Sequence, residues 1–144
     1  MIEFKIKINS FDFYFDNLLI YTSKQFIKNN KGRLNNMKLS VLNLAPLKSG
    51  ENFKDAIDAM VRLAQKTEQL GYERYWVAEH HNTKSVASSA TQLLIQHTLA
   101  NTKNIRVGSG GVMLPNHSPY LVAEQYGTLE TLYPGRVDLG LGRA

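Results

Sequence analysis

A regular alternation of strand-like and helix-like segments after Met37 limits the fold of this sequence more than any other feature. The strand-like segments are short apolar runs, and the segments between them repeat apolar residues at helical spacing. The strand-like runs lie at 38–44, 75–78, 105–107 and 137–141, and the helical segments at 53–70, 88–101 and 118–132. This βαβαβαβ order predicts an α/β protein whose parallel sheet is covered by helices.

The length of the repeating unit indicates a barrel. Each strand–helix unit takes about 27 residues, so eight units would need about 216, the size of a typical (β/α)8 barrel. A complete flavodoxin-like sheet would usually carry a fifth strand, and a chain that ends on a strand leaves an open edge. We therefore expect residues 37–144 to form the N-terminal half of a TIM barrel, with four strands and three helices, in a chain that is incomplete or depends on a partner.

Capping residues mark the ends of the predicted helices. Asn52 offers an N-cap side chain to the first helix, and Gly71 is suited to follow its last turn. Ser88 or Ser89 can cap the second helix. The pair Ser118–Pro119 combines an N-cap residue with proline at the first helical position, which predicts the start of the third helix.

The composition is that of a globular protein, with 43% hydrophobic and 20% charged residues. The chain has no cysteine, which excludes a disulfide scaffold, a thiol nucleophile and a thiolate metal site. Its net charge is +5, yet it has no basic run typical of nucleic-acid binding and no apolar stretch near the roughly 18 residues that span a membrane. We expect a cytoplasmic protein without nucleic-acid or membrane partners.

The first 36 residues differ in composition from the rest of the chain. They hold five of the six Phe but no Pro, and they carry six Lys and Arg against three Asp and Glu. Segment 11–16 alternates weakly and predicts a short strand or hairpin arm, and segment 31–36 reads as a polar linker. Asp12 and Asp16 interrupt the apolar part, which argues against a signal peptide. We interpret residues 1–36 as an N-terminal appendage or a start placed too far upstream, with a docking arm as the alternative.

The chemically unusual residues follow the predicted strands. The four strand ends carry, in order, Ala45-Pro46, Glu79-His80-His81-Asn82, Ser109-Gly110-Gly111 and Gly142-Arg143. Parallel α/β folds place their sites at the carboxyl ends of the strands. Because four separate ends converge on one rim, we expect a functional site there.

Glu79, His80 and His81 allow three interpretations. The first is a general base or an orienting pair for proton transfer near neutral pH, which makes all three candidate catalytic residues. The second is a hydrogen-bonded pair that only fixes the loop. The third, a metal site, is disfavoured because adjacent residues of an extended chain point to opposite faces and the HExxH spacing is absent, so we expect no metal ion. His117, in the loop before the third helix, is assigned a loop-fixing role.

Two glycine-containing segments are candidate ligand contacts. The run 108–111 fails the GxGxxG dinucleotide pattern, because Met113 stands where the last glycine is needed. Gly110 and Gly111 permit close approach of a flat ligand or an unusual backbone conformation, and a simple bulge or turn is the alternative. Arg143 can bind a phosphate through its fork of donors, and an ordinary surface arginine is the alternative.

Four ordered blocks of the sequence resemble the bacterial luciferase-like flavin monooxygenases. The second-strand block reads GYERYWVAEHHN (71–82) and the third-strand block reads IRVGSGGVMLPNHSP (105–119). Blocks 124–130 and 133–144 continue the match in order, so that the resemblance spans residues 38–144. Four blocks at coherent spacing are more specific than any single motif. The first 36 residues resemble nothing in that family.

The resemblance implies an enzyme on a (β/α)8 barrel that uses reduced FMN from a separate flavin reductase and O2 to oxygenate a small organic substrate. Deazaflavin F420 is the alternative cofactor, because some relatives use it. By position, His80 matches the catalytic histidine of the family, with Glu79 and His81 beside it. The implied cofactor contacts are Ser109, Gly110, Gly111, Gly142 and Arg143. The Gly110–Gly111 bond would be a cis peptide under the flavin ring, and Arg143 would contact the flavin phosphate.

The resemblance also implies an assembly. Members of the family commonly dimerise through the second and third helices, which correspond here to 88–101 and 118–132. Because the other half of the barrel is not part of this sequence, we expect the truncated chain to be inactive by itself. The alternative is a non-catalytic half barrel that acts only through association with a partner chain.

Overall fold

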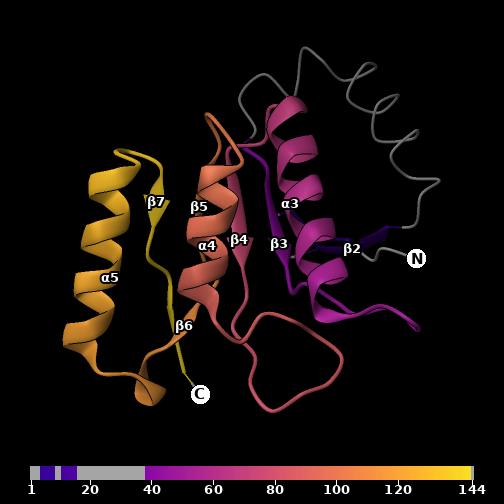
Figure 1. Cartoon of the computed structure of the whole chain (residues 1–144). Helices are drawn as coiled ribbons and strands as arrows, with labels where there is room; N and C mark the ends of the chain where they lie inside the picture. The colour runs from indigo at the N-terminus through magenta and orange to yellow at the C-terminus, as the bar shows by residue number, and fades with distance from the viewer. Residues whose placement is uncertain (1–3, 9–10, 16–37, 144) are drawn as a thin grey trace.

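The computed structural model describes residues 4–8, 11–15 and 38–143, in which strands and helices alternate along the chain (Figure 1). The strands are β1 (Phe4–Ile8), β2 (Phe11–Phe15), β3 (Ser40–Asn43), β4 (Arg74–Val77), β5 (Arg106–Ser109), β6 (Val112–Met113), β7 (Val137–Asp138) and β8 (Leu141–Gly142). The helices are α3 (Phe53–Gln69), α4 (Thr91–Ala100) and α5 (Pro119–Leu132), with a 3-10 turn η1 (Leu114–Asn116).

The main sheet has the strand order β2-β1-β3-β4-β5-β7, and its last four strands run parallel. Leu42 of β3 lies beside Trp76 of β4, which lies beside Gly108 of β5. Strands β6 and β8 form a second, two-stranded parallel sheet. The four parallel strands and three α-helices predicted for part of a TIM barrel are therefore confirmed.

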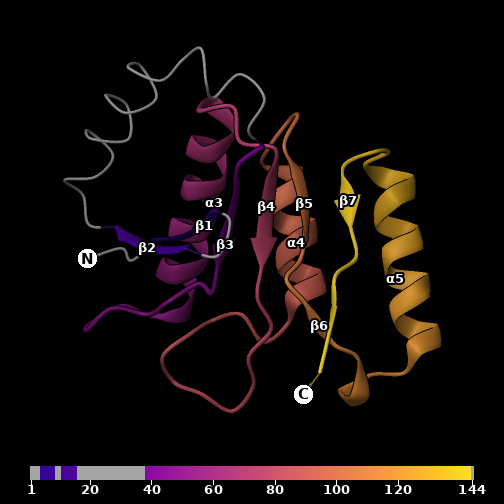
Figure 2. The same cartoon turned by 180° about the vertical axis from the view of Figure 1, so that it is seen from behind.

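The three α-helices cover one face of the main sheet (Figures 1 and 2). Alternate strand residues are fully or almost fully buried, among them Val41, Tyr75, Val77 and Val107. The Tyr75 hydroxyl donates a hydrogen bond to the Met60 carbonyl of α3, so this set faces the helices. The intervening residues are only partly buried. The core thus lies between sheet and helices, and the other face of the sheet is less covered.

The ends of α3 and the start of α5 follow the predicted capping chemistry. Asn52 and Asp55 form a capping box at the start of α3, each side chain accepting from the other residue's backbone N–H. Gly71, with φ +77°, follows the C-cap residue of the same helix. Ser118 is the N-cap residue of α5 and Pro119 its first residue, as expected.

The prediction that Ser88 or Ser89 caps α4 is wrong. The N-cap residue is Ala90, and it makes no side-chain capping bond. Ser88 is fully buried, and its carbonyl oxygen accepts from the backbone N–H of His80 and the hydroxyl of Thr91. The residue therefore joins the core behind β4, which removes its side chain from the helix end.

The predicted strand at 137–141 is two short strands, β7 and β8. The chain leaves the β5 ladder at Gly140, whose N–H donates to the Ser109 hydroxyl. The Gly140 carbonyl accepts from that hydroxyl and from the Val112 N–H. At this point the Ser109 hydroxyl takes the place of backbone hydrogen bonds between the two strands. The chain then continues as β8, which pairs with β6 instead of β5.

The hairpin predicted near residues 11–16 is present. Strands β1 and β2 pair in antiparallel fashion, and β1 also pairs with β3, where Lys5 is the register partner of Leu42. The linker expected at 31–36 lies outside the described residues, and the interpretation of 1–36 as an appendage or a misplaced start stays a prediction. Within the described ranges, no helix has the length and apolar character needed to cross a membrane.

Candidate active site

The loops that follow β3, β4 and β5 begin side by side. Asn43, Val77 and Ser109 are register partners at the carboxyl ends of these strands. The segments with unusual residues start immediately after them, as the sequence predicts. This rim of the sheet is therefore the candidate active site.

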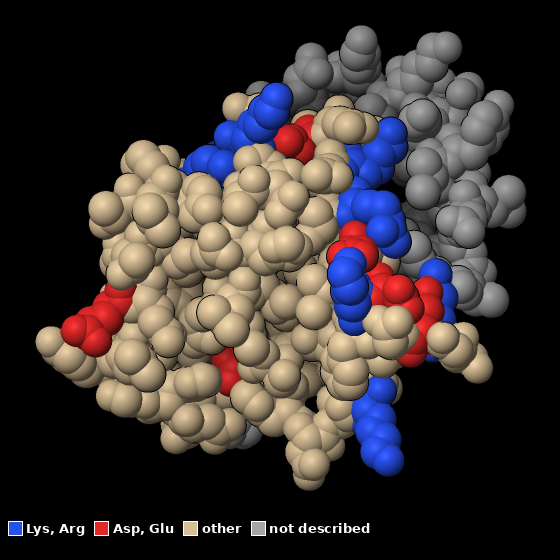
Figure 3. All heavy atoms as spheres, viewed as in Figure 1, with Lys and Arg blue, Asp and Glu red and all other residues tan. Residues whose placement is uncertain are grey.

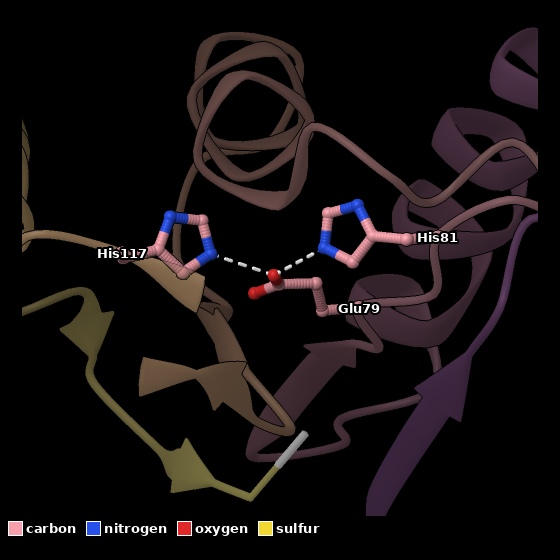
Figure 4. A group of neighbouring side chains, drawn as sticks. All are labelled: Glu79, His81 and His117. Carbon is pink, nitrogen blue, oxygen red and sulfur yellow. Dashed lines mark hydrogen bonds and ion pairs between the residues drawn. The ribbon is translucent and has the colours of Figure 1, made fainter. Parts of the chain in front are cut away.

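A buried carboxylate binds two imidazoles at the rim. Oε1 of Glu79 lies 2.6 Å from Nε2 of His81 and 2.6 Å from Nε2 of His117 (Figure 4). Oε2 of Glu79 accepts a hydrogen bond of 3.0 Å from the backbone N–H of Met113. The Glu79 side chain is 0% exposed, against 40% for His81 and 23% for His117. Glu79 thus joins the loop after β4 to the segment that follows β6.

The surroundings of Glu79 favour its charged form. Burial alone would raise the pKa of this carboxyl group. The hydrogen bonds from His81, His117 and the Met113 amide outweigh burial and hold the pKa below its usual value. A carboxylate that accepts three hydrogen bonds is therefore present throughout the neutral range.

The geometry of this group is that of hydrogen bonding. Glu79, His81 and His117 each offer one atom that could bind a metal ion, and these three atoms lie within 4.8 Å of one another. The cluster must therefore be compared with a metal site. Ligand atoms bound at about 2.1 Å around one ion stand roughly 3 Å or more apart. The two N···O separations of 2.6 Å are shorter and match charge-assisted hydrogen bonds.

The structure separates the predicted catalytic residues. Glu79 and His81 are in contact, but the His80 imidazole makes no hydrogen bond or ion pair with another described residue and is partly buried. Its backbone N–H donates to the Ser88 carbonyl. His80 and His81 thus have different surroundings, in agreement with the expectation that adjacent residues point apart.

His117 is the member of the cluster that sequence reasoning left outside the site. It was expected to fix its loop, and its hydrogen bond to Glu79 does join that loop to the one after β4. The signal that could have placed it was its position in the connection that follows β5 and β6, on the same rim as Glu79.

The peptide bond between Gly110 and Gly111 is cis, as the resemblance implies. Gly110 is exposed, and its N–H donates to the Val77 carbonyl. A Cβ atom on Gly110 would lie 3.0 Å from Cδ1 of Leu42 and 3.1 Å from Cβ of Trp76. The backbone at this point therefore packs directly on two apolar side chains of neighbouring strands.

The remaining predicted contacts have different surroundings. Ser109 is fully buried, and its hydroxyl both donates to and accepts from the backbone of Gly140. Gly142, in β8, pairs with Met113 of β6. Arg143 is exposed and makes no ion pair or hydrogen bond with another described residue. Ser109 is thus bound to the protein itself, whereas Arg143 presents its guanidinium to solvent.

Two loops of the rim are joined to each other. The Ala87 N–H donates to the Ala45 carbonyl, and the Leu47 N–H donates to the Ser85 carbonyl, each at 2.8 Å. An isolated antiparallel bridge joins Pro46 to Val86 between these bonds. The segments 45–47 and 85–87 therefore form a short two-stranded ribbon at the rim.

The comparisons with known proteins point to one family. The sequence pattern of the luciferase-like monooxygenase family matches residues 37–144. A luciferase-like monooxygenase of Escherichia coli (strain K12) is 57% identical over 105 residues, which are 73% of this chain and 31% of the relative. The crystal structure of apo-MsnO8 has a TM-score of 0.73 and 48% identity over 74% of this chain and 32% of its own. The chain thus spans about a third of the length of the curated relatives it matches.

Two more distant structures share the fold alone. The oxygenating constituent of 3,6-diketocamphane monooxygenase from Pseudomonas putida, in complex with FMN, has a TM-score of 0.66 and 23% identity over 75% of this chain and 30% of its own. An F420-dependent secondary alcohol dehydrogenase, in complex with an F420-acetone adduct, has a TM-score of 0.52 and 24% identity over 64% and 28%. Since the family pattern covers three quarters of the sequence and the matched strands and helices are all present, the chain belongs to the luciferase-like monooxygenase family.

Proposed function

We propose that this chain carries the flavin-binding rim of a monooxygenase that uses reduced FMN and O2 to oxygenate a small organic substrate. The observation that carries the proposal is the exposed backbone of Gly110, directly after β5. It shares the rim with the Glu79–His81–His117 cluster and with the exposed guanidinium of Arg143.

The residues present fit a flavin. The flavin ring system needs a flat, apolar surface to bind against. Gly110 has no side chain, and its backbone packs on Leu42 and Trp76. A phosphate needs a cation with directed donors, and Arg143 has no other partner among the described residues. Both requirements are met on one rim, by residues that follow different strands.

Each candidate residue has a separate task in this proposal. When bound, the reduced flavin supplies the two electrons with which one atom of O2 enters the substrate and the other leaves as water. His80 is the proposed catalytic residue, because its imidazole is free of protein hydrogen bonds within the described residues and can exchange a proton with a ligand. Glu79 and His81 act beside it, and Ser109 holds the backbone of Gly140 in place.

The partners follow from the cofactor. A cytoplasmic flavin reductase would supply reduced FMN, because the described residues include no binding motif for a nicotinamide cofactor. Deazaflavin F420 is the competing cofactor, supported by the F420-dependent dehydrogenase that shares the fold. Its ring would meet the same glycine backbone, so the two cofactors are distinguished by titrating the chain with each.

The experiment is an anaerobic titration of the chain with photoreduced FMN and with reduced riboflavin, which lacks the phosphate. We expect FMN to bind more tightly, and the R143A variant to lose about tenfold in FMN affinity while its riboflavin affinity stays the same. The R62A variant, on the exposed face of α3, is the matched control and should bind as the natural chain does. A chain that binds neither flavin would contradict the proposal.

A groove between α4 and α5 supports association with a second copy of the chain. It has a volume of about 510 Å³ and is lined by residues of both helices, including Leu93, Leu129 and Leu132. Leu93 is 71% exposed and Leu132 is 60% exposed. The helix α4 contains no Lys, Arg, Asp or Glu. Figure 3 shows that most charged side chains on this face gather over α3, and Glu124 of α5 is the acidic residue that lines the groove. An apolar helix surface of this kind is typical of an interface.

Sedimentation velocity tests this interface. We expect a dimer that the L93E variant converts to a monomer, because a carboxylate would be buried without a partner. The K54E variant changes a charge on exposed α3 and should leave the dimer intact. A monomer in the natural chain would contradict the self-association. Dimerisation without any flavin binding would instead favour the non-catalytic half barrel.

A further inference from the structure

The buried carboxylate at the rim has a fixed set of partners. Glu79 Oε1 faces the Nε2 atoms of His81 and His117, and its Oε2 faces the Met113 N–H. The Glu79 side chain is 0% exposed, so it is out of contact with bulk solvent. Among the described residues, these three groups are the ones that donate hydrogen bonds to Glu79.

The chemistry of a carboxylate decides which ring atoms carry protons. An ionised carboxyl group only accepts hydrogen bonds, so each Nε2 atom facing it must be a donor. In a neutral imidazole one nitrogen is protonated and the other is not. In their neutral forms, His81 and His117 are therefore restricted to the tautomer with the proton on Nε2, and each Nδ1 atom is left as an acceptor.

The position of the rings directs those acceptors outward. Figure 4 shows both rings with Nε2 toward Glu79 and the rest of the ring turned away from it. The ring centroids are 6.4 Å apart and the planes are tilted by 54°. The His81 side chain is 40% exposed and its Nδ1 atom makes no hydrogen bond with another described residue, whereas His117 also lines the groove between α4 and α5.

We propose that Glu79 is a positioning residue that fixes the tautomer of two histidines and presents the Nδ1 atom of His81 at the rim as a proton acceptor. The relevance of this acceptor to catalysis rests on the proposed function, but the tautomers themselves do not. Glu79 would then neither give nor take a proton. It would hold the His81 ring as a second proton acceptor beside His80, and would tie that ring to the segment carrying His117.

Nitrogen-15 NMR of the imidazoles tests the proposal directly on the flavin-free chain. The sequence contains only four histidines, and the exposed His97 on α4 is an internal reference in the same spectrum. We expect His81 and His117 each to show a slowly exchanging Nε2–H resonance and an unprotonated Nδ1. His97 should show the mixed tautomers and fast proton exchange of a solvated ring. The H81N and H117N variants assign the two resonances.

The E79Q variant provides the second measurement. A carboxamide has one accepting atom and one donating group, whereas Glu79 accepts on both oxygens. If the amide group faces the rings, both Nε2 atoms lose their acceptor and their N–H resonances should disappear or change tautomer. If the amide oxygen faces the rings, the bond from Met113 is lost instead, and the backbone amide resonance of Met113 should move. Circular dichroism checks that the E79Q variant folds. If it does not fold, the nitrogen-15 NMR spectrum of the natural chain by itself tests the tautomers of His81 and His117.

Several outcomes would overturn the proposal. One is that His81 and His117 match His97 in tautomer and exchange rate. Another is an E79Q variant in which the two Nε2–H resonances and the Met113 backbone amide resonance are all the same as in the natural chain. A bound metal ion on Nε2 of both rings would also overturn it, because metal binding removes those protons. Since no flavin is present in these measurements, failure of flavin binding would leave the tautomer result intact and would contradict only the proposed function.

Discussion

The two ends of the parallel sheet both carry ionisable side chains, but of different chemistry. At the amino ends of β4 and β5, Arg74 and Arg106 bind Asp138 of β7, and Arg74 also binds Glu73. At the carboxyl ends, Glu79 binds two imidazoles. A guanidinium is always charged, whereas an imidazole changes protonation near neutral pH. Ion pairs with guanidinium groups thus hold one end of the sheet together, and a carboxylate bound by two imidazoles holds the other.

Two glycines in and after β5 also differ in their surroundings. Gly108 is buried in the middle of the sheet and faces the backbone of Asp138, whereas Gly110 is exposed at the rim and faces the side chains of Leu42 and Trp76. One glycine allows two strands to approach each other, and the other lets the backbone pack on two apolar side chains. The comparison teaches that the stability of the sheet and the chemistry proposed for its rim depend on different residues.

The largest effect on stability is expected from a substitution that places a side-chain atom between β5 and β7. A Cβ on Gly108 would lie 2.3 Å from the Asp138 carbonyl oxygen, which is backbone and cannot turn away. We expect G108A to lower the free energy of unfolding by about 3 kcal/mol in urea denaturation. G127A is the control, because Gly127 lies inside α5 with nothing within 4 Å, and it should raise stability by about 1 kcal/mol. Equal effects of the two substitutions would contradict this account of Gly108.

The next effect concerns the charged network at the amino ends. The hydrogen bond from Arg106 is the main reason that the pKa of Asp138 is lowered, and Arg74 adds to it. A group whose folded pKa is depressed stabilises the fold above its unfolded pKa of about 3.9, and this contribution is lost as pH falls through the folded value. We expect D138N to cost about 2 kcal/mol at pH 7 and progressively less below pH 4. A cost that stays the same down to pH 2 would show that the charge of Asp138 is not the cause.

A smaller effect is expected at the carboxyl end. H117N removes one of the three hydrogen bonds to the Glu79 carboxylate, at a cost of about 1 kcal/mol in the free energy of unfolding. H97N changes an exposed histidine of α4 and should have no effect on urea denaturation. If H117N proved as costly as G108A, the rim would be as important for stability as the centre of the sheet.

The smallest effect is expected on the outer face of α3. Lys54 and Asp58 form an exposed ion pair one helical turn apart, and the hydrogen bond from Lys54 is the main reason that the pKa of Asp58 is lowered. Exposed pairs of this kind are screened by water and salt. We expect K54A to melt at the same temperature as the natural chain. A resolved loss of stability at low salt would show that charges far from the sheet ends also matter.

Features governed by neighbouring residues could be predicted from the sequence. The capping box at Asn52, the turn at Gly71 and the start of α5 at Ser118–Pro119 depend on atoms a few residues apart. The strand–helix alternation is equally local, and it led to the parallel sheet. The convergence of Glu79, Gly110 and Arg143 on one rim followed from the rule for parallel sheets rather than from any single motif.

Features that depend on distant partners could not be predicted. His117 and Glu79 are 38 residues apart, and no periodicity indicates their hydrogen bond. The break at Gly140 depends on the Ser109 hydroxyl, 31 residues earlier. Ser88 carries the right side chain for a cap, but burial behind β4 removes it from the helix end. In each case a tertiary contact decides between two locally acceptable arrangements.

The ribbon formed by 45–47 and 85–87 constrains how this rim can be diversified. Residues Ala45 and Ala87 are buried, and the two loops share backbone hydrogen bonds, so an insertion in either loop shifts the other. In a mutant library that varies only one of the two loops, most variants would lose the hydrogen bonds between segments 45–47 and 85–87. Engineering a new substrate preference here calls for exchanging both segments together as a single cassette, with Glu79 left in place as the fixed point behind them.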